Sequence, residues 1–216
     1  MQVTPYNTDQ SKKTQVEDMF DNIAPKYDLL NHVLSMKIDV LWRNNLVKWM
    51  RKDHPKLVLD VATGTGDLAI AVQKGLEAEV VGLDLSQQML NVGIDKIKKI
   101  NLSDKITMVK GDAENLTFED NKFDAVSVAF GVRNFENLEK GLAELRRVVK
   151  ENGSVFILEF SKVEGFLGPF YMFYFKNILP QIGKLVSKDN RAYTYLPDSV
   201  NAFPFGEKMK QILLDT

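Results

Sequence analysis

Residues 57–72 read LVLDVATGTGDLAIAV and decide the fold. The first five are apolar apart from Asp60, which is typical of a short buried strand. Gly64 and Gly66 then interrupt the apolar run, and the pattern that resumes after them has helical spacing. Glycines at such a turn let the backbone approach a ligand where a side chain would collide. The stretch therefore predicts a buried strand, a ligand-contacting turn and a helix.

The chain after this stretch alternates strand-like and helix-like segments. Strands alternating with helices at this spacing indicate an α/β fold, a mostly parallel twisted sheet with helices on both faces. Residues 53–216 are assigned to this core. The predicted strands are 57–61, 78–86, 105–112, 123–130 and 153–161, and the predicted helices are 67–75, 86–100 and 138–150.

Residues 1–52 are predicted to form a helical N-terminal cap. Val16, Met19 and Ile23 recur at helical spacing, and two further helical segments follow, with boundaries at Pro25 and Ser35.

The composition excludes several classes of function. Lys and Arg number 28 against 29 Asp and Glu, so the net charge of −1 offers no general field for nucleic acid. With no cysteine and only two histidines, we expect no metal site. The polar start lacks a signal region, and no apolar run approaches the roughly 20 residues that span a bilayer. We therefore expect a cytoplasmic protein.

Acidic residues near the glycine turn indicate the ligand. Asp84 lies twenty residues after Gly64, where a carboxylate can accept hydrogen bonds from both hydroxyls of a ribose. This fits NAD and S-adenosylmethionine alike, and a simple strand-to-helix connection is the structural alternative. Asp60 and Asp67 bracket the turn with carboxylates. These oppose a pyrophosphate, which favours helix termini free of negative charge, and suit a sulfonium and an ammonium group.

The ends of the third and fourth strands favour S-adenosylmethionine further. Asp112 is placed to meet an adenine amino group, and the Ala113 backbone N–H to meet a ring nitrogen. The fourth strand ends at Ala129, above the position of methyl transfer. A dehydrogenase would also need a substrate domain, for which 216 residues leave little room.

Several segments together resemble the class I S-adenosylmethionine-dependent methyltransferases: LDVATGTGD, GLDLSQQML, GDAENLTF, FDAVSVAFGVRNF and ILEFS. MFDNIAPKYDLLNHVLS, FGVRN and YTYLPDSV resemble, more narrowly, the family that C-methylates the quinol ring in menaquinone and ubiquinone biosynthesis. The match runs from about residue 16 to the last residue. It implies a Rossmann-like core, S-adenosylmethionine as cofactor and a prenylated quinol as substrate, with demethylmenaquinol converted to menaquinol.

The resemblance carries cofactor contacts onto individual positions. A contact that the family makes through a serine falls on Ala129, where only backbone is available. Thr63 and Lys37 stand where family members have glycine. The remaining implied contacts are Thr65 in the glycine turn, Asp84 at the ribose, and Asp112 with Ala113 at the adenine; Gly64 and Gly66 are candidates on the argument of close backbone approach.

The resemblance also implies a glycine and two antiparallel strands after residue 216, which would complete a seven-stranded sheet. They are absent from the sequence. Either the sequence is a piece of a longer chain, or the sheet has an exposed edge, which invites pairing with another chain and makes a homodimer one expected assembly.

Arg133 and Asn134 follow the fourth strand, within reach of the methyl-transfer position. Because the pKa of arginine stays above roughly 12, Arg133 is expected to stabilise a phenolate or order a water, with Asn134 as an orienting partner. The alternative for Arg133 is a salt bridge to Asp28 or Glu159.

Two residues of the cap carry open alternatives. Tyr27 either closes the cap over the substrate or packs in the core with its hydroxyl at the rim. His32 is either the general base or a surface residue of its helix.

Residues 162–186 crowd aromatic side chains between glycines and prolines. They are read either as a helix packed on the core or as an apolar lid. Residues 166–175, with Met19, Phe20 and Trp42, are the candidate lining for a prenyl tail, so we expect peripheral contact with the inner membrane face. Two alternative functions stay open: methylation of another small hydrophobic acceptor, and a non-catalytic nucleotide-binding subunit.

Overall fold

The structure is a computed structural model of the chain and describes residues 3–6, 8–35, 37–161 and 191–216. The aromatic segment 162–186 lies outside the described residues. The strands are β1 (Leu57–Val61), β2 (Glu79–Asp84), β3 (Ile106–Lys110), β4 (Phe123–Ala129) and β5 (Val149–Leu158). The helices are α1 (Lys12–Ile23), η1 (Ala24–Lys26), α2 (Tyr27–Leu34), α3 (Ile38–Met50), η2 (Arg51–Asp53), α4 (Asp67–Leu76), α5 (Gln87–Lys99), η3 (Val132–Asn134), α6 (Leu138–Val148), α9 (Arg191–Ala202) and α10 (Glu207–Asp215).

The described residues form one sheet of five parallel strands in the order β3-β2-β1-β4-β5. The chain builds outward from β1 to β3 and then returns to β4 on the other side of β1. Ligands of open α/β sheets bind at this change of direction, beyond the carboxyl ends of the strands. The predicted α/β class with a parallel sheet is confirmed.

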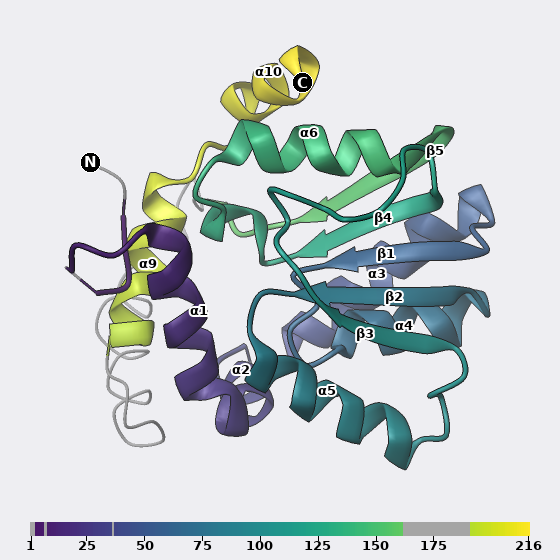
Figure 1. Cartoon of the computed structure of the whole chain (residues 1–216), viewed down its shortest axis with the longest axis horizontal. Coiled ribbons are helices and arrows are strands. Elements are labelled where there is room, and N and C mark those ends of the chain that lie inside the picture. The colour runs from purple at the N-terminus through teal and green to yellow at the C-terminus, as the bar shows by residue number, and fades with distance from the viewer. Residues whose placement is uncertain (1–2, 7, 36, 162–190) are drawn as a thin grey trace.

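Alternate side chains of each strand pack against different helical layers, as the two-residue period of a strand requires. Val58, Val80 and Ala125 belong to the cluster that buries α3, α4 and the inner side of α5. Leu59 and Val126 belong to the cluster that buries α6. Both faces of the sheet are therefore covered, as Figure 1 shows for the helices around it.

A third cluster lies beyond the carboxyl ends of the strands. Val16, Met19 and Ile23 of α1 pack there with Met89 of α5 and Tyr195 of α9. Figure 1 shows α1 in purple and α9 in yellow-green beside each other at this end of the sheet. Helices from the two ends of the chain thus cover the edge at which a ligand is expected.

Two details differ from the sequence prediction in their extent. β5 begins at Val149 rather than near Gly153, because Val149 pairs with Phe123 through an irregular register. Of the residues 1–52 predicted as a cap, α1 and α2 approach the carboxyl edge, whereas α3 packs on the sheet through Leu46 and Met50. No helix in the described part of the chain has the length and hydropathy to cross a membrane.

Candidate functional site

The turn after β1 uses left-handed backbone at three positions. Ala62, Gly64 and Gly66 have φ values of 53°, 57° and 79°. Such angles cost little only for glycine, which explains two of the three residue choices. Gly66 ends the turn, and α4 starts directly after it at Asp67. At Gly64 the turn therefore exposes backbone without a side chain at the carboxyl end of β1.

Asp84, the last residue of β2, connects this turn to the next strand tip. Its Oδ2 accepts a hydrogen bond from Gly64 N at 2.8 Å, and its Oδ1 accepts one from Ser86 N at 2.8 Å. Burial raises the pKa of Asp84 to about 6, although these backbone donors act in the opposite direction. The carboxylate is therefore held in a defined orientation and is ionised at neutral pH.

Asp112 lies beyond β3 and contacts the N-terminal helix. Lys13 Nζ donates to Asp112 Oδ2 at 2.6 Å, and Glu114 N donates to Asp112 Oδ1 at 2.9 Å. The Lys13 ammonium is thus paired with the carboxylate that the sequence places at an adenine.

One pocket joins most of the predicted residues. It lies between the strand tips and α1 and has a volume of about 80 Å³. The predicted residues that line the pocket are Tyr27, Gly64, Asp84, Asp112, Ala113, Ala129 and Asn134, with Phe20 of the predicted tail lining.

Asp60, Thr65, Gly66 and Arg133 are not among the lining residues. Asp60 is 1% exposed and accepts hydrogen bonds from Thr63 Oγ1 at 2.6 Å and Ser127 Oγ at 2.8 Å. Burial raises its pKa to about 6, and the charge of Asp84 acts in the same direction. Asp60 therefore supports the turn and contributes negative charge behind the pocket.

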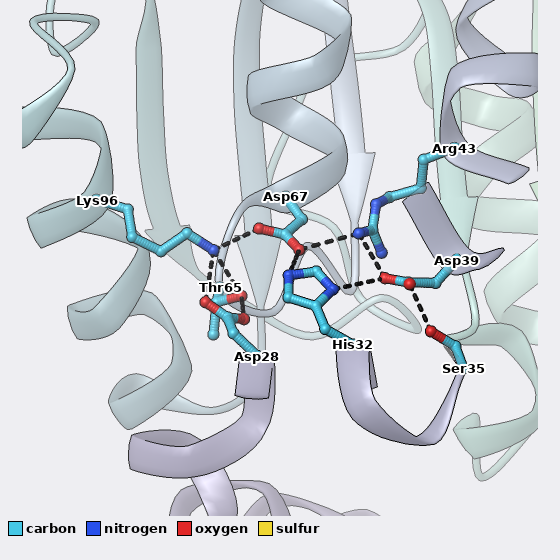
Figure 2. A network of polar contacts seen from close by, with 8 residues as sticks. All are labelled: Asp28, His32, Ser35, Asp39, Arg43, Thr65, Asp67 and Lys96. Carbon is cyan, nitrogen blue, oxygen red and sulfur yellow. Dashed lines mark hydrogen bonds and ion pairs between the residues drawn. The ribbon is translucent and has the colours of Figure 1, made fainter. Parts of the chain in front are cut away.

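Thr65 points into a polar network on the other side of the turn (Figure 2). Its Oγ1 donates to Asp28 Oδ1 at 2.5 Å and accepts a hydrogen bond from Lys96 Nζ at 3.2 Å. Lys96 also pairs with Asp28 at 2.8 Å and with Asp67. The network thus ties α2, α4 and α5 to the turn, and Asp67 is neutralised by Lys96 rather than directed into the pocket.

His32 occupies the other end of this network (Figure 2). Its Nδ1 lies 3.2 Å from Asp39 Oδ2, and its Nε2 lies 4.0 Å from Asp67 Oδ2. These three residues could surround a cation. Arg43 Nη2, however, bonds Asp39 at 2.6 Å and Asp67 at 3.1 Å and supplies positive charge between them. His32 is not among the residues that line the pocket.

Arg133 pairs with Glu159, one of the two partners that the sequence analysis proposed. Nη1 donates to Glu159 Oε1 at 2.8 Å and to the carbonyl of Phe130, and the guanidinium lies over the Phe160 ring. Its Nε is buried and has no hydrogen-bond partner. The cation is therefore held just behind Phe130, which itself lines the pocket.

Asn134 reaches the pocket next to this ion pair. Its Oδ1 accepts a hydrogen bond from the Tyr195 hydroxyl at 3.1 Å. Phe130 lines the pocket and stacks on Phe160 with a centroid distance of 4.6 Å. Trp42, predicted to line the tail site, lies 6.0 Å from Phe130 and is not among the lining residues. Met19, predicted to contact a prenyl tail, is instead 2% exposed in the α1 cluster.

Lys13, Glu17 and Phe135 line the pocket and were missed by the sequence analysis. Helical spacing identified the apolar face of α1, but it did not show which part of the molecule the polar face covers. The pair of lysines at positions 12–13, at the start of α1, was the only local signal for Lys13.

Comparison with known proteins identifies the family of the chain. A model of the ubiE/COQ5 methyltransferase family matches residues 8–216. Demethylmenaquinone methyltransferase of Bacteroides fragilis is 49% identical over 213 residues, which cover 98% of this chain and 87% of that protein. The ubiquinone/menaquinone biosynthesis C-methyltransferase UbiE of Geobacter sulfurreducens is 44% identical over 94% of this chain and 80% of its own length.

Among solved structures, the cyclase SpnF aligns with a TM-score of 0.61 and 24% identity, over 71% of this chain and 62% of that chain. At this identity the likeness shows the fold alone. That the same fold carries a cyclase illustrates why function must be argued from the site.

Proposed function

Since the chain belongs to the ubiE/COQ5 methyltransferase family, we propose that it methylates a ring carbon of a prenylated quinol, converting demethylmenaquinol to menaquinol. The enzyme is an S-adenosylmethionine-dependent C-methyltransferase. One observation connects this reaction to the site: the Asp84 carboxylate, proposed to bind the cofactor, and the Asn134 amide, proposed to bind the acceptor, line the same pocket from opposite sides of the sheet's change of direction.

The pocket has the donors and acceptors that S-adenosylmethionine needs. Asp84 would accept from the ribose hydroxyls, and Asp112 with the Ala113 N–H would bind the adenine. Gly64 and Ala129 offer backbone, and Asp60 adds negative charge for a cation. When bound, S-adenosylmethionine supplies an electrophilic methyl group.

The acceptor must be oriented and kept from water while its ring oxygen loses a proton. Asn134 is the polar group placed to bind that oxygen, and Phe20, Tyr27 and Phe130 provide an apolar surface for the ring. Burial raises the pKa of Tyr27 and keeps its phenol protonated, as a donor. Arg133 would stabilise the phenolate by its charge, and direct contact requires it to leave Glu159.

A methyl-transfer assay with labelled cofactor and a panel of short-chain naphthoquinols and benzoquinols tests the proposal. We expect methylation of a naphthoquinol that lacks the ring methyl group. Asn134→Ala should lower kcat about 100-fold, the lower end of the roughly 100–1,000-fold cost of removing one donor that stabilises developing negative charge. Transfer only to a non-quinol phenol would replace the substrate class, and failure to bind S-adenosylhomocysteine would overturn the enzymatic assignment.

We further propose peripheral contact with a membrane, where a prenylated substrate resides. Ile38, Leu41 and Trp49 are exposed and lie on one stripe of α3, and Leu29 of α2 is exposed nearby in the chain. Tryptophan and basic residues favour the membrane interface. Sedimentation with anionic phospholipid vesicles should carry the protein down, and Trp49→Ala should reduce binding; equal binding of both proteins would refute this surface.

A homodimer stays a prediction. In the described sheet, β3 and β5 form the edges, and Val155 of β5 is exposed. An open edge can pair with a second copy. Sedimentation velocity over a range of protein concentrations distinguishes a dimer from a monomer.

A further inference from the structure

The short helix η3 carries Asn134 and is held by Lys12, a residue near the N-terminus of the chain. Lys12 Nζ donates to the carbonyl of Arg133 at 2.9 Å and to the carbonyl of Phe135 at 2.8 Å. Helix ends leave carbonyls without intrahelical partners, and the ammonium satisfies two of them here. The backbone groups on both sides of Asn134 are therefore fixed by α1.

The lysine is placed at a cost in solvation. Lys12 is only 8% exposed. Burial lowers its pKa to about 8, and the nearby charge of Arg133 acts in the same direction, while Glu114 and Glu136 raise it. A lysine at the start of a surface helix would ordinarily keep its ammonium in water. The buried position of Lys12 at η3 therefore indicates that the lysine has a specific role in holding this segment.

Two glutamates extend this attachment. Lys12 N donates to Glu136 Oε1 at 2.8 Å, and Glu136 N donates to Glu114 Oε1 at 2.7 Å. The first turn of α1 is thus bonded through its backbone and through its side chain to the segment that follows β4.

The side chain of Asn134 is held from a different direction. The hydroxyl of Tyr195, which is 4% exposed on α9, donates to Asn134 Oδ1. Burial raises the pKa of Tyr195 to about 12, so the phenol stays a donor at neutral pH. With Oδ1 engaged, the amide NH₂ is the part of Asn134 left to donate to a ligand oxygen.

We propose that Lys12 and Tyr195 are positioning residues for methyl transfer. Lys12 holds the backbone on either side of Asn134, and Tyr195 holds the side-chain amide of Asn134. Asn134 thereby presents an N–H donor to the acceptor oxygen. The inference rests on the proposed function for the identity of that oxygen. The positioning itself is a property of the protein without substrate. The helices that carry them, α1 and α9, meet in one buried cluster that includes Tyr195.

Steady-state kinetics of Lys12→Met, Lys12→Arg, Tyr195→Phe and Asn134→Ala test the proposal. Lys12→Met and Tyr195→Phe should lower kcat about 5–20-fold, the typical effect of losing one or two hydrogen bonds, and leave the KM for S-adenosylmethionine within about twofold. Lys12→Arg, which keeps the charge and the donors, should recover part of the loss. Lys110→Met is the matched control, because Lys110 joins α1 to β3 through Glu17 without touching η3.

A double-mutant cycle separates positioning from general stability. If Tyr195 acts through Asn134, Tyr195→Phe should cost less than about twofold in kcat when Asn134 is already alanine. Full additivity of the two losses would overturn the role of Tyr195.

Hydrogen exchange gives a readout that needs no substrate. In the free enzyme, amides of residues 131–136 should exchange at least several-fold faster in Lys12→Met and Tyr195→Phe than in Lys110→Met. Unchanged exchange in both variants would overturn the inference. Should no quinol be methylated, the exchange result still decides the positioning, and only the proposed substrate fails. If Lys12→Met does not fold, the nearly isosteric Tyr195→Phe variant tests the positioning by the same exchange measurement.

Discussion

The two sides of the pocket are built differently. On the turn side, comprising residues 62–66 and the tips of β2 and β3, Asp84 is oriented by backbone N–H groups of Gly64 and Ser86. On the η3 side, residues 130–135 are held by Lys12, Tyr195 and Glu159. The turn side is thus assembled by adjacent strand tips, whereas the η3 side depends on helices from both ends of the chain. Changes on the turn side should affect cofactor binding, and changes on the η3 side should affect turnover.

The largest effect is expected at Asp84. Asp84→Ala removes the proposed ribose acceptor and leaves two backbone donors without their partner. The dissociation constant of S-adenosylhomocysteine should rise about 100-fold, since hydrogen bonds to charged groups contribute roughly 1.5–3 kcal/mol each. Isothermal titration measures this change. A variant that binds as tightly as the original protein would show that Asp84 is not part of the cofactor site. It would also contradict the separation of a cofactor-binding turn side from the η3 side.

Asp60→Asn should stabilise the free protein. Because the folded-state pKa of Asp60 is raised to about 6, its ionisation lowers the free energy of unfolding as pH rises from about 4 to 6. The variant should therefore equal the original protein near pH 4 and exceed it by about 1–3 kcal/mol above pH 6. Its side-chain amide can still bond the hydroxyls of Thr63 and Ser127.

Urea unfolding at a series of pH values measures the Asp60 effect. The same variant should bind cationic S-adenosylmethionine more weakly, with a smaller loss for neutral S-adenosylhomocysteine. A uniform stabilisation at all pH values would show that Asp60 is not the group whose charge is costly.

Lys96→Met tests whether the network of Figure 2 supports the turn. Lys96 bonds Asp28, Thr65 and Asp67, and the carboxylates of Asp28 and Asp67 are partly exposed. We expect the free energy of unfolding to fall by about 1 kcal/mol, the upper range for an exposed pair. Cofactor affinity should fall about threefold because the turn loses the contact between Lys96 and Thr65. Isothermal titration measures this change, and kcat should change less. A larger loss in kcat than in affinity would contradict the separation of the two sides.

The smallest effect is expected at Lys13. Lys13→Met frees Asp112 from an ammonium 2.6 Å away. Because the lysine competes with the ligand for this carboxylate, S-adenosylhomocysteine should bind about threefold more tightly, within the range of a partly exposed ion pair. Isothermal titration beside Lys110→Met provides the comparison. Weaker binding would indicate that Lys13 itself contacts the cofactor.

The turn side was largely predictable from the sequence. Apolar period and glycine placement located β1 and the turn, and parallel strands bring Asp84 and Asp112 to one edge. The direction of the Thr65 side chain was not predictable, because Asp28 and Lys96, which bind it, are distant in sequence. Asp67 was read as facing a cationic ligand, whereas Lys96 and Arg43 neutralise it.

Local periodicity and the geometry of parallel strands were enough to predict the parallel sheet, its helical layers and the polar groups at the strand tips. Three-dimensional packing was needed to show that Lys13 lines the pocket and that Lys12 and Tyr195 bond the segment around Asn134. It was also needed to show that Glu159 rather than Asp28 holds Arg133. These contacts join segments about sixty to one hundred and twenty residues apart, or select one of two plausible partners. The spacing of residues along one element carries no information about which distant element its polar face will cover.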